Sequence, residues 1–164
     1  WTLKTDNAHK FKILKEELVA EEGMLSRTYI GGIPSFQAEV FKEQTEHSTD
    51  HYYVFYDHQS NAHTHFSSGY PHVNASPKVI TSASINNDVG SNFAVERYTK
   101  DVTEKNTLLY VNFTNFKVKD DGIAAFWSDE RSFYMEVYPL NAKPDSQGKQ
   151  KTAFVKLQLN EKLW

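Results

Sequence analysis

Five histidines crowd one short stretch of this sequence, residues 51–72, which read HYYVFYDHQSNAHTHFSSGYPH. Three of them, His58, His63 and His65, flank a QSNA segment that is typical of a turn between two strands. With a loop of two or four residues, His58 would lie opposite His63, and His65 would share their face. A three-residue loop would place Asp57 opposite His63 instead, because a shift of one residue changes every pairing.

Both registers bring together side chains that bind transition metals, since three imidazoles, or two imidazoles and a carboxylate, suit Zn²⁺ or Cu²⁺. The hairpin therefore predicts a divalent-metal site with ligands drawn from a set of four residues: Asp57, His58, His63 and His65. No metal motif of fixed spacing is present, however. We expect these histidines to lie on the surface or at the rim of a site, with a weak metal affinity or a response to pH near 6.5.

Aromatic residues are the second chemical signal, at 14% of the chain. The two-residue period of a strand would place rings on both faces of residues 52–56, and a second group of rings lies within residues 126–138. Tyr and Trp are common at recognition surfaces, where one end is apolar and the other polar. We predict a ligand site that includes six of these rings, although a large core could also bury them: Tyr52, Tyr53, Tyr56, Tyr70, Trp127 and Tyr134.

Catalytic and cofactor motifs are missing from the sequence. It has no cysteine, which excludes thiolate chemistry and Cys-based zinc sites, and no nucleophile-elbow, phosphate-loop or dinucleotide fingerprint. Asp129, Glu130 and Arg131 read as charged residues of a turn rather than as an acid–base pair. We therefore predict a protein that is not an enzyme.

These residues must be positioned by strands. Short runs with a two-residue period begin near Phe36 and continue to residues 152–159, separated by turn sequences rich in Gly, Asn, Asp and Pro. This pattern predicts a mainly β, antiparallel sandwich, jelly roll or barrel, built as a single domain over residues 1–164. Residues 1–23 form a separate case, because Phe11, Leu14 and Leu18 share one stripe before Gly23 and predict a short helix.

Charge and hydropathy narrow the class of partner. The net charge is −3 with no run of lysine or arginine, so we expect no nucleic-acid partner. No stretch approaches the roughly 20 apolar residues of a membrane span. The abundance of Asn, Ser, Thr and Tyr favours a secreted or cell-surface protein. We predict an extracytoplasmic, non-enzymatic module that binds a glycan or a partner protein; the alternatives are a lipocalin-like carrier of a small apolar ligand and a His-based metal-binding protein.

Overall fold

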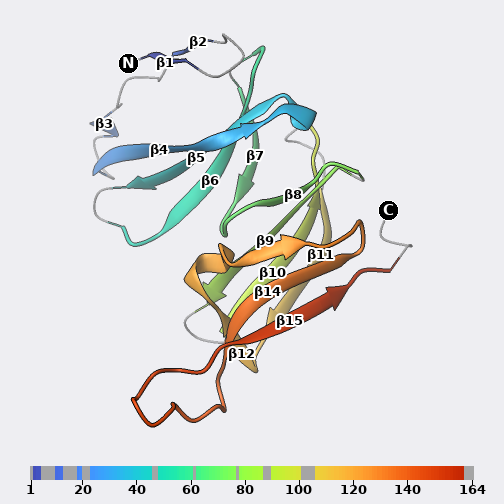
Figure 1. The fold of residues 1–164 in the computed structure, drawn as a ribbon. Helices are drawn as coiled ribbons and strands as arrows, with labels where there is room; N and C mark the ends of the chain where they lie inside the picture. The colour runs from blue at the N-terminus through green and yellow to red at the C-terminus, as the bar shows by residue number, and fades with distance from the viewer. Residues whose placement is uncertain are drawn as a thin grey trace. The chain divides into compact units, whose positions relative to one another are not determined.

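The structure is a computed structural model, and it describes residues 2–4, 10–12, 18–19, 23–45, 48–60, 62–76, 78–86, 90–100 and 106–160. The chain divides into two compact units, and Figure 1 shows the strands of each. Unit 1 comprises Trp1–Ser67 with Thr99–Glu104, and unit 2 comprises Ser68–Tyr98 with Lys105–Trp164. The prediction of a single domain stays a prediction, because two compact units can belong to one domain or to two.

Unit 1 is built on a five-stranded antiparallel sheet in the order β3-β4-β5-β6-β7. Its strands are β3 (Leu18–Val19), β4 (Gly23–Ile33), β5 (Ala38–Thr45), β6 (His51–Asp57) and β7 (His63–Ser67), with a 3-10 helix η1 (Pro34–Phe36) between β4 and β5. A separate pair joins β1 (Thr2–Lys4) to β2 (Lys10–Lys12). Strand β6 is buried on both faces from Tyr53 to Asp57, which explains its continuous run of apolar and aromatic residues.

The N-terminal helix predicted for residues 1–23 is not seen. The described residues of that segment lie in β1, β2, β3 and the first position of β4, and the remainder of the segment lies outside the described residues. Gly23, expected to end a helix, instead opens β4 and pairs with Val19. A stripe of three apolar residues is a weak helix signal, and strand pairing with a neighbouring segment overrides it here.

Unit 2 holds two antiparallel sheets that share one core. The first has the order β11-β10-β9-β8, from β8 (His72–Asn74), β9 (Val79–Asn86), β10 (Gly90–Arg97) and β11 (Thr107–Phe113). In the second, β14 (Ser132–Pro139) pairs with β12 (Phe116–Val118), β13 (Ala125–Trp127) and β15 (Ala153–Gln158), and a 3-10 helix η2 (Asp120–Gly122) follows β12. Buried residues of both sheets form the core: Val79, Ala83, Phe93, Val95, Val118, Phe133, Met135, Val137 and Leu159.

The mainly β, antiparallel architecture predicted from the sequence is confirmed, and the sheets are not closed into a barrel. The predicted strands at residues 79–85 and 152–159 correspond to β9 and β15. The run at residues 107–118 bends, as expected from its length, and forms β11 and β12. Among the described residues, no helix has the length and apolar character needed to cross a membrane.

Candidate functional site

The histidine hairpin of unit 1 forms, but with neither of the two expected registers. His63 pairs with Tyr56 and His65 pairs with Phe55, because a bulge inserts Thr64 as an extra residue in β7. Adjacent residues of β6 point to opposite faces, so their two histidine partners do as well. His63 is accordingly exposed and stacks edge-on against Tyr56, whereas His65 is buried against Phe55. The expected shared face of His58, His63 and His65 is wrong for this reason.

The two remaining candidate ligands already have partners within unit 1. His58 Nε2 lies 2.9 Å from Glu39 Oε1, and Asp57 forms an ion pair with Lys100. Burial alone would raise the pKa of Asp57, but hydrogen bonds from Lys100 and the turn backbone hold that pKa well below its usual range. Within the described ranges, no three His, Asp or Glu side chains are placed to hold a metal ion. Metal binding therefore stays a prediction that this geometry does not favour.

A polar network immobilises one of the predicted tyrosines of unit 1. Tyr53 and Tyr56 are only 2% and 4% exposed, whereas Tyr52 is 52% exposed. Glu43 Oε1 accepts hydrogen bonds from the Tyr56 hydroxyl and from Arg27 Nε, each at 2.6 Å. Burial, together with the bond to Glu43, raises the pKa of Tyr56. These contacts fix Tyr56 as part of the fold rather than as a free binding group.

Two of the predicted ligand-binding rings, Trp127 and Tyr70, make contacts inside unit 2. Trp127 packs against the core, and its indole Nε1 lies 3.4 Å from the carbonyl oxygen of His72. Tyr70 is half-buried and contacts the His72 ring at 5.2 Å between centroids. His72 Nε2 donates to the carbonyl oxygen of Gly122 at 2.7 Å, and burial lowers the pKa of this imidazole.

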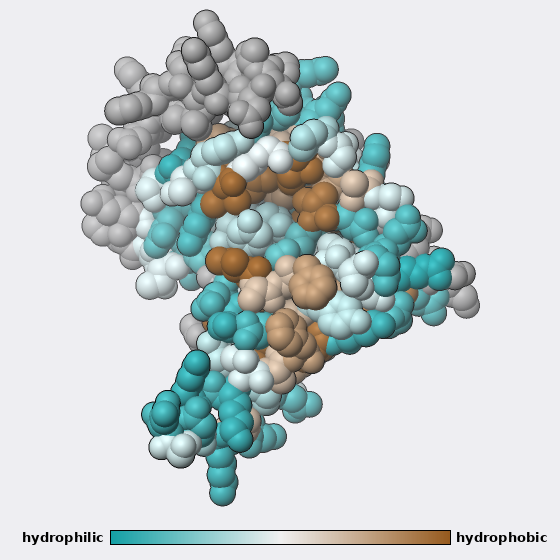
Figure 2. Space-filling view, viewed as in Figure 1, coloured by the Kyte–Doolittle hydropathy of each residue, from teal (hydrophilic) through white to brown (hydrophobic). Residues whose placement is uncertain are grey.

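Tyr134, the last predicted ring, lies on the solvent face of the β14 sheet. Burial alternates along β14: Phe133, Met135 and Val137 are buried, whereas Tyr134, Glu136 and Tyr138 are half-buried. This two-residue alternation gives the sheet one core face and one wet face. Figure 2 shows light-brown hydrophobic side chains at the surface over β13 and β14, bordered by teal hydrophilic ones.

Three rings and one lysine make up what we call the aromatic face: Phe126, Tyr134, Phe154 and Lys156. Phe126 and Tyr134 are cross-strand partners whose rings stack at 5.4 Å between centroids, only 11° from parallel. Lys156, opposite Tyr134 on β15, places its Nζ 5.7 Å from the centroid of the Tyr134 ring. Because β13 and β15 flank β14, the tyrosine ring is held between the Phe126 ring and the ammonium group. Phe126 and Phe154 remain 51% and 64% exposed.

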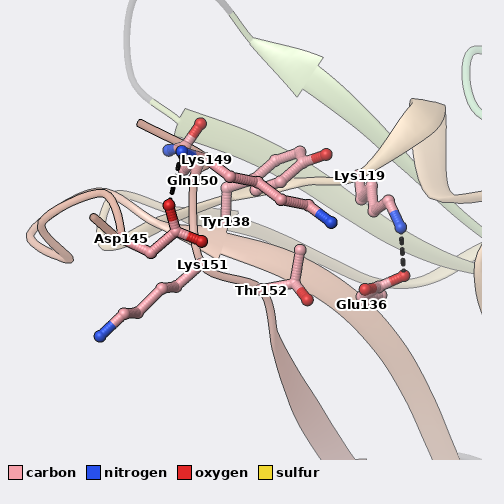
Figure 3. Close-up of a pocket in the computed structure, with 8 residues that line it drawn as sticks. All are labelled: Lys119, Glu136, Tyr138, Asp145, Lys149, Gln150, Lys151 and Thr152. Atoms are coloured by element: carbon pink, nitrogen blue, oxygen red, sulfur yellow. Dashed lines mark hydrogen bonds and ion pairs between the residues drawn. The ribbon is translucent and has the colours of Figure 1, made fainter. Parts of the chain in front are cut away.

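A hollow of about 530 Å³ lies at the other end of the same sheet (Figure 3). Its lining comes from the residue after β12, from β14 and from the segment before β15: Lys119, Glu136, Tyr138, Asp145, Lys149, Gln150, Lys151 and Thr152. A tight turn shapes one wall, since Asp145 Oδ1 accepts the backbone N–H of Gln147 and Lys149, each at 2.9 Å. Gly148, with φ of 77°, supplies the left-handed residue that this turn requires.

Charge in the hollow is mixed, with three ammonium groups and two carboxylates. Lys119 Nζ donates to Glu136 Oε2 at 2.8 Å. This bond raises the pKa of Lys119 and lowers the pKa of Glu136, so both groups are charged at neutral pH. In Figure 3 the ammonium of Lys149 points towards this pair, whereas that of Lys151 points away from it.

No family model, curated protein or solved structure matches this chain. A fold alone does not imply a function, so the function of this chain depends on the geometry of its site.

The aromatic face and the hollow were largely missed by the sequence analysis, which selected only Tyr134 among their residues. Two signals could have found them. Phe154 occupies a polar position in the alternation of β15, between Thr152 and Lys156. Residues 116–119 and 132–160 together carry six lysines against two carboxylates, in a chain whose net charge is −3. The lysines form no run in the sequence, yet five of them lie on or beside the β14 sheet: Lys117, Lys119, Lys149, Lys151 and Lys156.

Proposed function

We propose that this chain is a non-enzymatic, extracytoplasmic binding module and that the aromatic face of unit 2 holds the sugar rings of a glycan. The observation that carries the proposal is the parallel stack of Phe126 on Tyr134, fixed by Lys156 on the far side of the tyrosine ring. Rings held in place before the ligand arrives lose little freedom on binding, and this preorganisation favours affinity.

The mixture of rings and charges favours a glycan over a partner protein. The centre of a protein–protein interface is depleted of charged residues. On this face, by contrast, Lys156 lies opposite Tyr134, and Glu136 lies opposite the exposed Phe154. A sugar ring has an apolar face of C–H groups and a rim of hydroxyl groups. An aromatic ring can cover the first, while the neighbouring ammonium and carboxylate groups can hydrogen-bond the second.

Binding to immobilised oligosaccharides tests the proposal. The set contains matched pairs: uronic acids with their methyl esters, sialylated chains with desialylated ones, and sulfated chains with unsulfated ones. Replacing Phe126 or Phe154 by Ala should weaken binding by more than about 1 kcal/mol each, as expected for exposed anchor rings. Tyr110→Ala is the matched control, because Tyr110 is an exposed ring of β11 in the other sheet of unit 2.

Loss of binding in the two phenylalanine variants with little change in Tyr110→Ala would support the proposal. Absence of binding to every oligosaccharide, or equal losses in all three variants, would overturn it. Circular dichroism of each variant shows whether the fold is retained, so a loss of binding can be assigned to the ring.

A further inference from the structure

We infer that the glycan is anionic and that the hollow beside Lys149 receives its carboxylate or sulfate group. This inference rests on the proposed function and adds the chemical class of the ligand. The aromatic face would hold sugar rings, and the hollow would select those that carry a negative charge.

The aromatic face and the hollow are continuous on one sheet. One side of β14 carries Tyr134 of the aromatic face, followed by Glu136 and Tyr138 of the hollow. Tyr134 and Tyr138 are four residues apart, which corresponds to about 13 Å of strand. A ligand that reaches both features must therefore have more than one ring, so an oligosaccharide should bind more tightly than a monosaccharide.

The balance of charge in the hollow favours an anionic ligand. Lys119 forms an ion pair with Glu136, and Asp145 Oδ1 accepts hydrogen bonds from two backbone N–H groups of its own turn. Among the residues that the structure describes, no carboxylate lies within ion-pair distance of the Lys149 ammonium, which points towards the Lys119–Glu136 pair and attracts Glu136 only over a longer distance. Three ammonium groups against two carboxylates leave the lining with a net positive charge. An acidic substituent complements this charge, whereas a neutral sugar does not.

The size of the hollow suits a charged sugar. A hollow of about 530 Å³ falls within the range of ligand-binding pockets and exceeds what a single acidic group fills. Gln150, Thr152 and Tyr138 add polar groups that can bond the hydroxyl groups of the sugar bearing the charge.

The test compares Lys149→Gln with Lys143→Gln on the matched oligosaccharide pairs. Both variants remove one positive charge from the segment between β14 and β15, but Lys143 does not line the hollow. We expect the native chain to prefer the acidic member of a pair. Lys149→Gln should weaken binding of that member by about tenfold, as for a lost charge-assisted hydrogen bond, and leave the neutral member unchanged. Lys143→Gln should change neither.

Each result decides between the two proposals. Equal binding of acidic and neutral members, with both weakened by Phe154→Ala, would overturn the inference and leave the proposed function standing. Equal effects of the two lysine variants would show attraction by net charge alone and would also overturn it. An oligothymidylate that binds as tightly as the best oligosaccharide would indicate a nucleic-acid ligand and overturn both. The carboxylated and sulfated pairs separate the two kinds of acidic group.

Discussion

Replacing Phe133 by Ala should destabilise unit 2 severely. Phe133 is fully buried, and its ring lies 5.2, 5.5 and 5.8 Å from those of Trp127, His72 and Phe93. Removing a buried Phe side chain costs about 3–5 kcal/mol, through lost transfer free energy and the cavity left behind. Typical domains have only about 5–15 kcal/mol of stability in total, so the loss is a large fraction. Urea unfolding followed by circular dichroism measures it as a lower midpoint.

Phe154→Ala is the matched control for this prediction. It removes the same side chain from the adjacent strand β15, but on the wet face of the sheet. We expect a change below about 1 kcal/mol, the range of a cross-strand pair at an exposed position. Comparable losses in the two variants would refute the assignment of the two faces, and with it the existence of a free aromatic face.

Two further variants test the buried polar groups. Burial lowers the pKa of His72, so the folded state resists protonation of this imidazole. The free energy of unfolding should therefore fall as the pH drops below the ordinary histidine pKa of about 6.5. In His72→Gln, the melting temperature should change less between pH 7 and pH 5 than it does in the native chain. In unit 1, Glu43→Gln replaces the carboxylate that accepts from Tyr56 and should cost about 1–3 kcal/mol in urea unfolding. The exposed Asp50→Asn should cost almost nothing, and equal effects of the two changes would contradict the network.

The strands could be predicted from the sequence because their signal is local. Alternation along residues 152–159 predicts which side of β15 is buried, and Val155, Leu157 and Leu159 do pack on the core. The turn after Asp57 could also be predicted, because an Asp side chain often bonds the backbone of the residues that follow it. In the structure, Asp57 Oδ1 accepts the backbone N–H groups of Gln59 and Ser60.

Register and burial could not be predicted in the same way. A bulge at Thr64 makes His63 and His65 pair with adjacent residues of β6. The two histidines therefore point to opposite faces, and the expected histidine set does not form. The position of the bulge depends on the pairing of β6 with β7, which no single segment encodes. Rings on both faces of β6 indicated an excess of exposed aromatic surface, but Tyr53 and Tyr56, on opposite faces of the strand, are both buried. Tyr56 packs with Phe41 and Val54 in a small core of unit 1.

The candidate site was the hardest feature to predict, because its residues are brought together only by the fold. Lys119 follows β12 and Lys149 precedes β15, so these two lysines are 30 residues apart in sequence yet line one hollow. Phe126 looked like an ordinary core residue, because its three-residue strand is too short to show which side of the sheet is covered. Phe154 was marked only by its polar position in the alternation of β15.

Chemical-shift mapping of the aromatic side chains tests the central claim most directly. The protein, labelled with ¹³C in its Phe and Tyr rings, would be titrated with the tightest-binding oligosaccharide from the matched set. We predict that the resonances of Phe126, Tyr134 and Phe154 move with a common saturation curve while those of Tyr110 and Tyr52 stay in place. Shifts confined to Tyr52 and the other rings of unit 1, or no shift at any ring, would contradict the assignment of the aromatic face as the binding site.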